Sequence, residues 1–506
     1  MLSSIFPVNL FSDNLLLLLS IVILTAIFVT QAGYKYGVPS LLLFLAVGMA
    51  FGQDGVGIRF DNFDIAQSVG NIALTVILLA GGMETDINDI KPVMRQGVIL
   101  STLGVILTVA FTGWFIWLLS TRMPQALPFG TLGCFLLAAT MSSTDSASVF
   151  SILRGSRMKL KNNLGSILEL ESGSNDPVAY VLTIILVQVI SAVSAPEWEM
   201  PSSDARPMAA LTLTLSFVFQ IVIGAGIGIC MGMAGRWLIK RTRLNGSALY
   251  AIMTLSIGFL TNSLAATLKG NGLLAIYIAA IIIGNEKKLP FKKDVLKFLD
   301  GITWLAQILM FLLLGLLVNP SELPKVALPA ILIAIFMSVV ARPLSVFILL
   351  APFRKMTWRD KSFVSWVGLK GAAPILFAIY PVVADIPEAK NMFNIVFFIT
   401  LLSLLFQGTT IPFAARRLKV GEDAEPEPDT FGIEMPNEMG TLKEMTLSGD
   451  DLATQNTLKG LAMPEGKRVV MIKRGEEFIV PHGHTELHPG DKLLLIEYQL
   501  PDNVVS

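Results

Sequence analysis

Long apolar stretches separated by short polar connections dominate this chain. Stretches near or above the length needed to cross about 30 Å of hydrocarbon cover residues 14–35, 39–52, 65–83, 95–120, 129–150, 163–192, 208–237, 246–267, 272–285, 295–318, 325–351, 362–383 and 390–415. Two of them, 39–52 and 272–285, are short, but each lies between other stretches. The pattern predicts a polytopic α-helical membrane protein with about 13 transmembrane helices. The first stretch lacks a basic leader and a cleavage site, so we interpret it as a retained span.

The composition agrees with a membrane protein. Charged residues make up only 15% of the chain, against about a quarter in soluble domains, because charges are excluded from hydrocarbon. The formal net charge is zero, which gives no argument for a nucleic-acid partner. Cys134 and Cys230 lie in apolar stretches, and we interpret them as small hydrophobic residues rather than a disulfide or a metal site.

Basic residues concentrate in every second connection. These connections contain Arg154, Arg157, Lys159 and Lys161, then Arg236, Lys240, Arg241 and Arg243, then Lys287, Lys288, Lys292 and Lys293, then Arg354, Lys355, Arg359 and Lys361, and finally Arg416, Arg417 and Lys419. Connections rich in lysine and arginine face the cytoplasm. The alternation therefore predicts an N-terminus outside the cell and a C-terminus in the cytoplasm.

Two pairs of stretches are similar to one another at a separation of about 230 residues. Residues 38–52 are similar to 270–284, and residues 77–84 are similar to 310–317. The separation corresponds to an odd number of spans, so the two halves would have opposite orientations in the membrane. Inverted repeats of this kind are typical of secondary transporters that bind their substrate near the middle of the bilayer.

Helix-breaking residues occur at corresponding positions of the two halves. Residues 137–150 end in a run of Ser, Thr and Asp that includes Asp145, and such side chains compete with backbone hydrogen bonding. Gly368, Gly371 and Pro374 interrupt the run of residues 366–381, with Lys370 at the break. We therefore expect two discontinuous crossing helices, in which Asp145 compensates exposed helix N-termini and Lys370 compensates exposed C-termini.

The sixth stretch contains three carboxylates, Glu169, Glu171 and Asp176, although an ionised carboxylate costs about 3 kcal/mol at membrane depth. Glu169 lies close to the cytoplasmic connection, where water can solvate it. Arg342 lies in the middle of the eleventh stretch and cannot lose its proton, so we expect it to pair with Glu171. Asp176 would then have no fixed counter-charge, and either a proton or a metal cation would neutralise it. That competition is what an antiporter needs.

These residues resemble, in order, the motifs of the NhaP/NHE-type monovalent cation:proton antiporters. The segments STD (143–145), ELESGSND (169–176), RP (342–343) and GLKGAAP (368–374) are similar to the Thr-Asp, EGESLxND, Arg-Pro and GLRGAxP motifs of that family. The resemblance covers roughly residues 10–415. It implies an NhaA-like antiporter fold in the cytoplasmic (inner) membrane of a bacterium. It also implies a homodimer, in which a core domain moves like an elevator against a dimerisation domain.

The resemblance also implies roles for individual residues. Glu171 and Arg342 match a structural ion pair of the family. Thr144 would act partly through its backbone. The cation- and proton-binding residues that the resemblance implies are Asp176, Asp145, Thr144, Ser172 and Asn175.

Two positions bear on the substrate and on the stoichiometry. The pair Asn175–Asp176 resembles the electroneutral branch of the family, whose electrogenic members have two aspartates. Ala80 stands where many sodium-type members have an acidic residue. This departure from the family pattern puts sodium in doubt as the substrate.

The composition changes after Val420. Residues 421–432 are acidic and contain proline, and residues 466–498 read as strand, turn, strand, loop and strand. This pattern resembles the TrkA-C (RCK_C) regulatory module, which accompanies potassium transporters and channels and can bind small regulators, and it favours potassium. We predict a transmembrane antiporter domain at 1–419, a linker at 420–432 and a small cytoplasmic α/β domain at 433–506.

All three histidines, His482, His484 and His488, lie in this module. A His-x-His sequence can chelate a metal, but we favour a polar hairpin surface. No glycine-rich nucleotide fingerprint precedes the module, and we expect no cofactor.

The favoured interpretation is a secondary antiporter, not an enzyme, that exchanges K+ for H+ without net charge. A Na+(Li+)/H+ antiporter shares every motif and stays open as an alternative. An RCK-regulated ion channel would need a filter sequence such as TVGYG, which the chain lacks. An intramembrane aspartyl protease built on Asp145 and Asp176 would need a Gly-x-Gly-Asp motif, which is missing as well.

Overall fold

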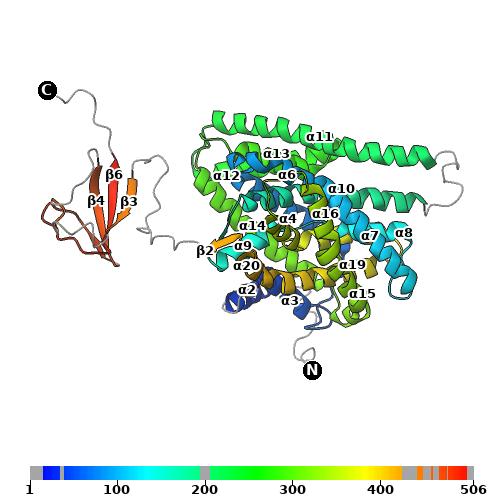
Figure 1. The fold of residues 1–506 in the computed structure, drawn as a ribbon. Coiled ribbons are helices and arrows are strands. Elements are labelled where there is room, and N and C mark those ends of the chain that lie inside the picture. Colours follow the sequence, from blue (N-terminus) through cyan, green and yellow to red (C-terminus); the bar gives the residue numbers. More distant parts are fainter. Residues whose placement is uncertain are drawn as a thin grey trace. The chain divides into compact units, whose positions relative to one another are not determined.

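The computed structural model describes residues 15–34, 39–193, 206–423, 442–447, 457–459, 467–475 and 477–497. It divides into two compact units, Met1–Asp423 and Ala424–Ser506, and each is described by itself. The described part of the first unit is almost entirely helical, and that of the second consists of strands and connections (Figure 1).

The helices of the first unit occupy the predicted apolar stretches. They are α2 (Leu15–Tyr34), α3 (Ser40–Phe51), α4 (Phe63–Glu84), α5 (Ile87–Ile90), η2 (Lys91–Val93), α6 (Met94–Ile99), η3 (Leu100–Gly104), α7 (Val105–Arg122), α8 (Thr131–Thr140), α9 (Ser146–Gly155), α10 (Leu164–Val193), α11 (Arg206–Arg241), α12 (Ser247–Thr267), α13 (Gly272–Gly284), α14 (Lys292–Leu316), η6 (Pro320–Glu322), α15 (Leu323–Phe336), η7 (Met337–Ala341), α16 (Arg342–Leu350), α17 (Trp358–Trp366), α18 (Ala372–Val383), α19 (Ala389–Leu402), η8 (Ser403–Gln407) and α20 (Gly408–Arg417). Among the described residues, eight helices are long and apolar enough to cross a membrane, and five apolar helices are shorter. The predicted polytopic helical fold is confirmed. The count of 13 spans stays a prediction, because length alone does not show that a short helix crosses.

Two helical segments are interrupted in the middle, as predicted. The first gap lies between the end of α8 at Thr140 and the start of α9 at Ser146. The second lies between the end of α17 at Trp366 and the start of α18 at Ala372. The gaps contain the hydroxyl-rich run and the glycines that the sequence marks as helix breakers.

The short helix of each half packs against a long helix of the other half. The short helix α3 lies along α14, and the short helix α13 lies along α4. Gly48 of α3 faces Gly315 of α14, and Gly82 of α4 faces Tyr277 of α13, each so closely that an added side chain would collide. Because α3 is similar in sequence to α13 and the end of α4 to the end of α14, this is the packing that the predicted inverted repeat would give.

Three long helices contain a π-helical turn, namely η3, η7 and η8. Such turns are rare in proteins and often lie at functional sites. The η7 turn directly precedes Arg342, and the η8 turn contains Ser403 and Gln407. Ser403 and Gln407 hydrogen-bond the backbone at the α17–α18 break.

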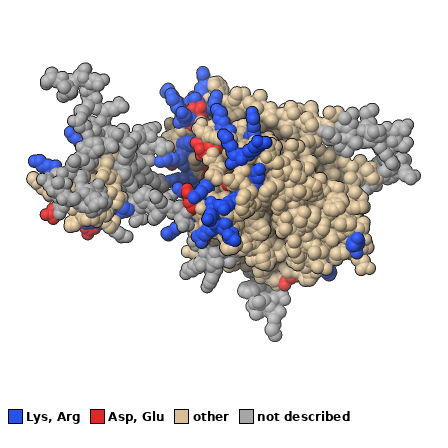
Figure 2. Space-filling view, viewed as in Figure 1, with Lys and Arg blue, Asp and Glu red and all other residues tan. Residues whose placement is uncertain are grey.

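Lysine and arginine side chains gather at one end of the first unit, and the rest of the visible surface carries few of them (Figure 2). The basic last turns of α11 and α20 contribute to this end. We call it the basic face, and we call the opposite end the far face.

A two-stranded sheet joins the α9–α10 connection to the residues that follow α20. Strand β1 (Met158–Leu160) pairs antiparallel with β2 (Gly421–Asp423). The backbone N–H of Lys161 donates to the carbonyl oxygen of Val420 at 2.9 Å, and Lys161 Nζ lies 3.4 Å from the Glu422 carboxylate. The apolar pattern gives no indication of this short sheet.

The second unit contains one antiparallel sheet in the order β3-β6-β4-β5. Its strands are β3 (Leu442–Thr446), β4 (Lys467–Arg474), β5 (Glu477–Ile479) and β6 (Lys492–Glu497). The last three are the predicted strands, whereas β3 lies outside the pattern that predicted them. The described residues of this unit contain no helix, so only the sheet of the predicted α/β domain is observed.

An ion pair supports the second unit. Arg474 donates to Asp491 through Nε at 2.9 Å and Nη2 at 2.7 Å. Burial alone would raise the pKa of Asp491, but hydrogen bonds from Arg474 and from the His488 amide outweigh it and hold the pKa below its ordinary value. The three histidines are exposed, and no group of three or more His, Cys, Asp and Glu side chains within the described residues could hold a metal.

Candidate functional site

The α8–α9 break places Asp145 at the start of a helix. Residues 141–145 leave the helical conformation, and Asp145 caps α9 by accepting a hydrogen bond from the Ser148 N–H at 3.2 Å. The Ser148 hydroxyl also donates to this carboxylate. Exposed N–H groups at a helix N-terminus carry partial positive charge, so the Asp145 carboxylate lies at the position that the predicted compensation requires.

The α17–α18 break crosses the first one. The backbone N–H of Asp145 donates to the carbonyl oxygen of Leu369 at 2.8 Å. Lys370 is 4% exposed, and its Nζ donates to the carbonyl oxygen of Ser143 at 2.9 Å. The ammonium group of Lys370 thus lies against a carbonyl group of the other break, where the predicted compensation requires it. Gly371 must lack a side chain here, because a Cβ would lie 2.5 Å from Asp145 Oδ2.

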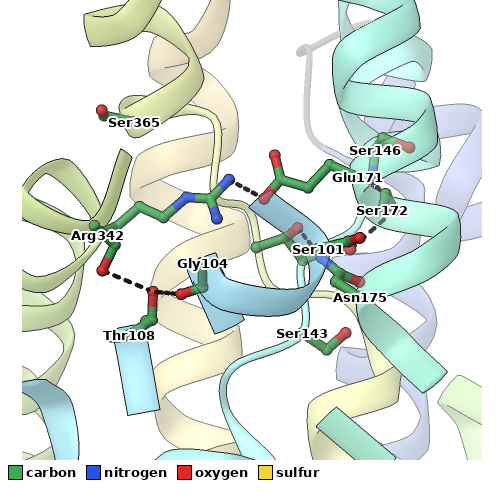
Figure 3. A network of polar contacts seen from close by, with 12 residues as sticks. Ser101, Gly104, Thr108, Ser143, Ser146, Glu171, Ser172, Asn175, Arg342 and Ser365 are labelled. Atoms are coloured by element: carbon green, nitrogen blue, oxygen red, sulfur yellow. Dashed lines mark hydrogen bonds and ion pairs between the residues drawn. The ribbon is translucent and has the colours of Figure 1, made fainter. Parts of the chain in front are cut away.

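Helix α10 brings Asp176 to this crossing. Asp176 is buried, and its Oδ1 accepts a hydrogen bond from the Ser143 hydroxyl. Ser172, one turn earlier on α10, donates to the Thr144 carbonyl oxygen at 2.9 Å and accepts from the Ser146 N–H at 3.0 Å (Figure 3). These bonds hold the unwound chain against α10.

Asn175 points to the same unwound segment. Its Nδ2 lies 2.5 Å from Thr144 Oγ1, and Asn175 is fully buried. The structure therefore brings together all the predicted cation- and proton-binding residues, which are Asp176, Asp145, Thr144, Ser172 and Asn175.

Glu171 and Arg342 form a buried ion pair beside the site. Arg342 Nη2 lies 2.5 Å from Glu171 Oε1, and the two residues are 6% and 1% exposed (Figure 3). Gly368 allows this approach, because a Cβ there would lie 3.3 Å from Arg342 Nε. The pair occupies Glu171 and leaves Asp176 without a salt bridge among the described residues.

A cavity of about 530 Å³ connects this site to the basic face. Asp176, Asp145, Thr144 and Ser172 line it, together with Arg154 near the basic face. Asn175, Glu171, Arg342 and Lys370 do not contribute to the lining. A cation entering from the basic face would thus contact the four lining residues. The other four residues would support these lining residues from behind.

A second cavity, of about 1200 Å³, lies on the other side of the site. It is lined by Tyr180, Tyr380, Asn71, Asn262 and Lys269, among others, and no carboxylate is among its described lining residues. Asp176 does not line it. The site is therefore open toward one face only in this conformation.

Several residues of the site are not found by reasoning from the sequence. Ser143 bonds Asp176, Ser403 bonds the Lys370 N–H at 3.0 Å, and Tyr277 and Asn271 border the site from α13. The polar run at residues 142–148 signals Ser143, since every hydroxyl in an apolar helix needs a partner. Tyr277 gives no signal, because a tyrosine in an apolar helix is usually ordinary packing.

This geometry defines a secondary transporter, in which two broken helices cross at a buried carboxylate that is open to one face. The chain belongs to the sodium/hydrogen exchanger family, whose model, described as "Sodium/hydrogen exchanger, transmembrane", matches residues 18–417. A TrkA-C domain model matches residues 452–496. Both predicted resemblances are confirmed.

Named relatives cover most of the chain. It is 38% identical over 469 residues to "K(+)/H(+) antiporter NhaP2" of Shewanella baltica (strain OS223), which covers 91% of this chain and 77% of the relative. It is 34% identical over 486 residues to "K(+)/H(+) antiporter NhaP" of Alkalimonas amylolytica, covering 95% and 80%.

The fold of the first unit is also found in a solved structure. The sodium proton antiporter MjNhaP1 from Methanocaldococcus jannaschii at pH 8 superimposes with a TM-score of 0.65 at 20% identity, covering 79% of this chain and 97% of that one. At this level of identity the likeness shows the fold alone.

Proposed function

We propose that this protein is a secondary antiporter that exchanges K+ for H+ at Asp176. The observation that carries the proposal is a buried carboxylate with hydroxyl and carbonyl oxygens around it and no salt bridge, at the end of a cavity. Carboxylate, hydroxyl and carbonyl oxygens are the ligands that hard cations prefer. The names of the relatives support K+ as the cation.

In this mechanism Asp176 carries one cation or one proton at a time. Moving an ionised carboxylate through a low-dielectric barrier is costly, so the core crosses only when Asp176 is neutralised by either partner. The Glu171–Arg342 pair is already neutral and moves without a change of charge. Asn175 adds no second carboxylate, which makes the exchange electroneutral.

The substrate preference follows from the number of carboxylates. Ala80 is buried on α4 and supplies no acidic ligand. Fewer anionic ligands give a weaker field at the site, which favours the larger K+ over the more tightly hydrated Na+. Na+/H+ exchange at the same residues is the second candidate.

The orientation and assembly belong to the same proposal. Because lysine-rich and arginine-rich connections remain in the cytoplasm, the basic face is the cytoplasmic side of a bacterial inner membrane. The N-terminus then lies outside, and the TrkA-C domain lies in the cytoplasm, where it can bind a regulator. The protein works as a homodimer, as the family resemblance implies.

Inside-out membrane vesicles with an acidified lumen test the proposal. Adding K+ should dissipate the pH gradient, and Asp176→Asn should abolish the response. Asp61→Asn, which alters an exposed carboxylate in the connection before α4, should exchange normally. Normal exchange by Asp176→Asn would refute the role of Asp176. Comparing K+, Na+, Li+ and Rb+ decides between the two candidate substrates.

Voltage provides a second test. A net charge crossing the membrane gains about 2.3 kcal/mol per 100 mV, so an electrogenic exchange would respond steeply to an imposed voltage. The proposed exchange should keep the same rate. A voltage-dependent rate would disprove electroneutrality while leaving the site assignment intact.

A further inference from the structure

Three oxygen atoms converge near the basic face, well away from Asp176. Thr85 Oγ1 lies 2.6 Å from Glu169 Oε1 and 2.8 Å from the carbonyl oxygen of Gly81. A hydroxyl group has one proton and can donate it once. With Glu169 ionised, one of these two short contacts joins two oxygens with no proton between them. Such a pair of oxygens is stable when a proton or a cation is supplied from elsewhere.

A buried tyrosine hydroxyl adjoins this group. Tyr277 is 3% exposed, and its hydroxyl lies beside Thr85 without a hydrogen bond of ordinary geometry within the described residues. Tyr277, Thr85 and Glu169 line the same cavity as Asp176. An unsatisfied buried hydroxyl costs about 1–3 kcal/mol. A ligand in the adjoining cavity would satisfy the Tyr277 hydroxyl and remove this cost.

Helix α10 connects this group to the transport site. Glu169, Gly173 and Asp176 lie at positions i, i+4 and i+7, on one face of the helix and about 10 Å apart from end to end. The Tyr277 ring lies against Gly173, where a Cβ would be 2.3 Å from its Cζ and 2.6 Å from its hydroxyl oxygen. The hydroxyl of Tyr277 therefore lies between the two carboxylates along the wall of the cavity.

The charge at this mouth favours a cation. Glu169 forms no ion pair with a lysine or arginine among the described residues, and Glu84 lines the same cavity. Arg154 is the basic residue of the lining, so two carboxylates outnumber one guanidinium at the entrance.

We propose that Glu169, Thr85 and Tyr277 form a second subsite, which holds the monovalent cation before it reaches Asp176. The Thr85 hydroxyl would donate to Gly81, and its lone pairs, the Glu169 carboxylate and the Tyr277 oxygen would face the cation. The subsite rests on the proposed cation exchange and adds an entry step on the basic face. It raises the local concentration of cation next to Asp176 without taking part in the proton competition there.

Inside-out vesicles expose the basic face to the bath, so the apparent KM for bath K+ reports on the subsite. Choline chloride should keep the ionic strength constant, so that screening does not change with K+. We expect Glu169→Gln to raise this KM about tenfold, the loss expected for one contact to a charged group. Vmax should change by less than about twofold. Tyr277→Phe, which removes only the hydroxyl, should raise the KM about two- to threefold.

A double-mutant cycle separates a shared site from independent damage. In the Glu169→Gln background, Tyr277→Phe should have no further effect on the KM. Full additivity of the two changes would overturn the shared site. Asp294→Asn is the matched control, because Asp294 is an exposed carboxylate in the first turn of α14 and does not line the cavity. An equal rise in KM for Asp294→Asn would reduce the effect to general surface charge.

The outcomes are distinguishable from failure of the exchange itself. If Asp176→Asn still exchanges, the proposed function fails. If Asp176→Asn is inactive but Glu169→Gln and Tyr277→Phe keep the original KM, only the subsite fails. Should Glu169→Gln not accumulate in membranes, Glu169→Asp replaces it in the cycle and is expected to give an intermediate KM. An unchanged KM in that variant and in Tyr277→Phe would equally refute the subsite.

Discussion

The cavity that reaches Asp176 and the cavity beyond Tyr180 share the helices α4, α10, α13 and α18, but they differ in the polar groups that line them. The cavity toward the basic face measures about 530 Å³ and is lined by Glu84, Asp145, Glu169 and Asp176. The cavity on the other side measures about 1200 Å³, and Lys269 is the charged residue among its described lining. Cation-binding chemistry is thus available from one face, and the second cavity is a space that Asp176 would face only after α10 has moved.

The layer between the cavities is built from reversible polar contacts. Asn271 Nδ2 donates to the carbonyl oxygen of Pro177 at 2.7 Å, directly after Asp176 in α10. The hydroxyl of Tyr380 donates to Asn71 at 2.7 Å, and Asn262 donates to Thr75 at 2.7 Å. In the proposed mechanism, such bonds would break and re-form as α10 and α18 move past α4 and α13.

By contrast, α13 packs closely against α11, backbone to backbone. Gly224, Gly228 and Gly232 of α11 lie one turn apart and face the α13 backbone, where a Cβ on Gly228 would be 2.6 Å from the carbonyl oxygen of Ala275. Close backbone packing through small residues is a strong form of helix association in membranes. In the proposed mechanism, α11 and α13 would form the wall against which α10 moves.

The largest effect is expected from breaking the Glu171–Arg342 ion pair, which lies beside the carboxylate-lined cavity. Arg342→Gln leaves Glu171 buried without its partner, which costs about 3–5 kcal/mol. Thermal unfolding of the purified protein should show the loss, and Glu171→Gln together with Arg342→Gln should recover part of it. Lys269→Gln at the second cavity is the control, with an expected change within about 0.5 kcal/mol, because Lys269 is exposed. An equal loss of stability in Arg342→Gln and Lys269→Gln would show that the two cavities do not differ in their dependence on a buried ion pair.

Access from the two faces gives the next effect. In a background with Cys134 and Cys230 replaced by serine, Ser166→Cys in the basic-face cavity and Gln188→Cys in the second cavity report on access. An impermeant thiol reagent added to the bath of inside-out vesicles should label Ser166→Cys at least about tenfold faster, because a minor conformer is populated at about 10% or less. Right-side-out vesicles should reverse the order. Faster labelling of Gln188→Cys from the bath of inside-out vesicles would disprove the proposed orientation.

The Asn271–Pro177 bond provides a smaller effect in the same assay. Asn271→Ser keeps a side chain able to cap α13, as Asn271 does through the Leu274 N–H at 3.0 Å, but it cannot reach Pro177. Loss of about 1 kcal/mol shifts the ratio of the two conformations about fivefold, so the ratio of labelling at Gln188→Cys from the outside to labelling at Ser166→Cys from the inside should rise by up to that factor. Asn62→Ser changes only the cap of α4 and should leave labelling unchanged. A decrease at Gln188→Cys would show that the bond stabilises the opposite conformation.

The sequence predicts the helix breaks and the Glu171–Arg342 pair because apolar spans contain few polar or charged residues, so that each one can be assigned a partner or a role. A buried arginine needs a carboxylate, and the glycines at 368 and 371 cannot continue a helix comfortably. It does not predict that Ser143 bonds Asp176 or that Tyr277 lies against Gly173, because these contacts depend on how helices rotate and cross. Its position in the sequence predicts that Glu169 is solvated near the cytoplasmic connection, whereas the structure places it in contact with Thr85, 84 residues away.

The smallest effect on the cavities is expected from the second unit. Deleting residues 424–506 leaves both cavities and β2 intact, so exchange should continue with the same KM for K+ and with an altered response to pH or to a regulator. Deleting residues 421–506 also removes β2, and with it the partner of β1 in the α9–α10 connection. Because that connection joins the helix capped by Asp145 to the helix carrying Asp176, the longer deletion should lower the rate of exchange further. Equal rates in the two deletions would mean that β2 serves only as the start of the linker, whereas loss of all exchange in the shorter deletion would make the second unit structural.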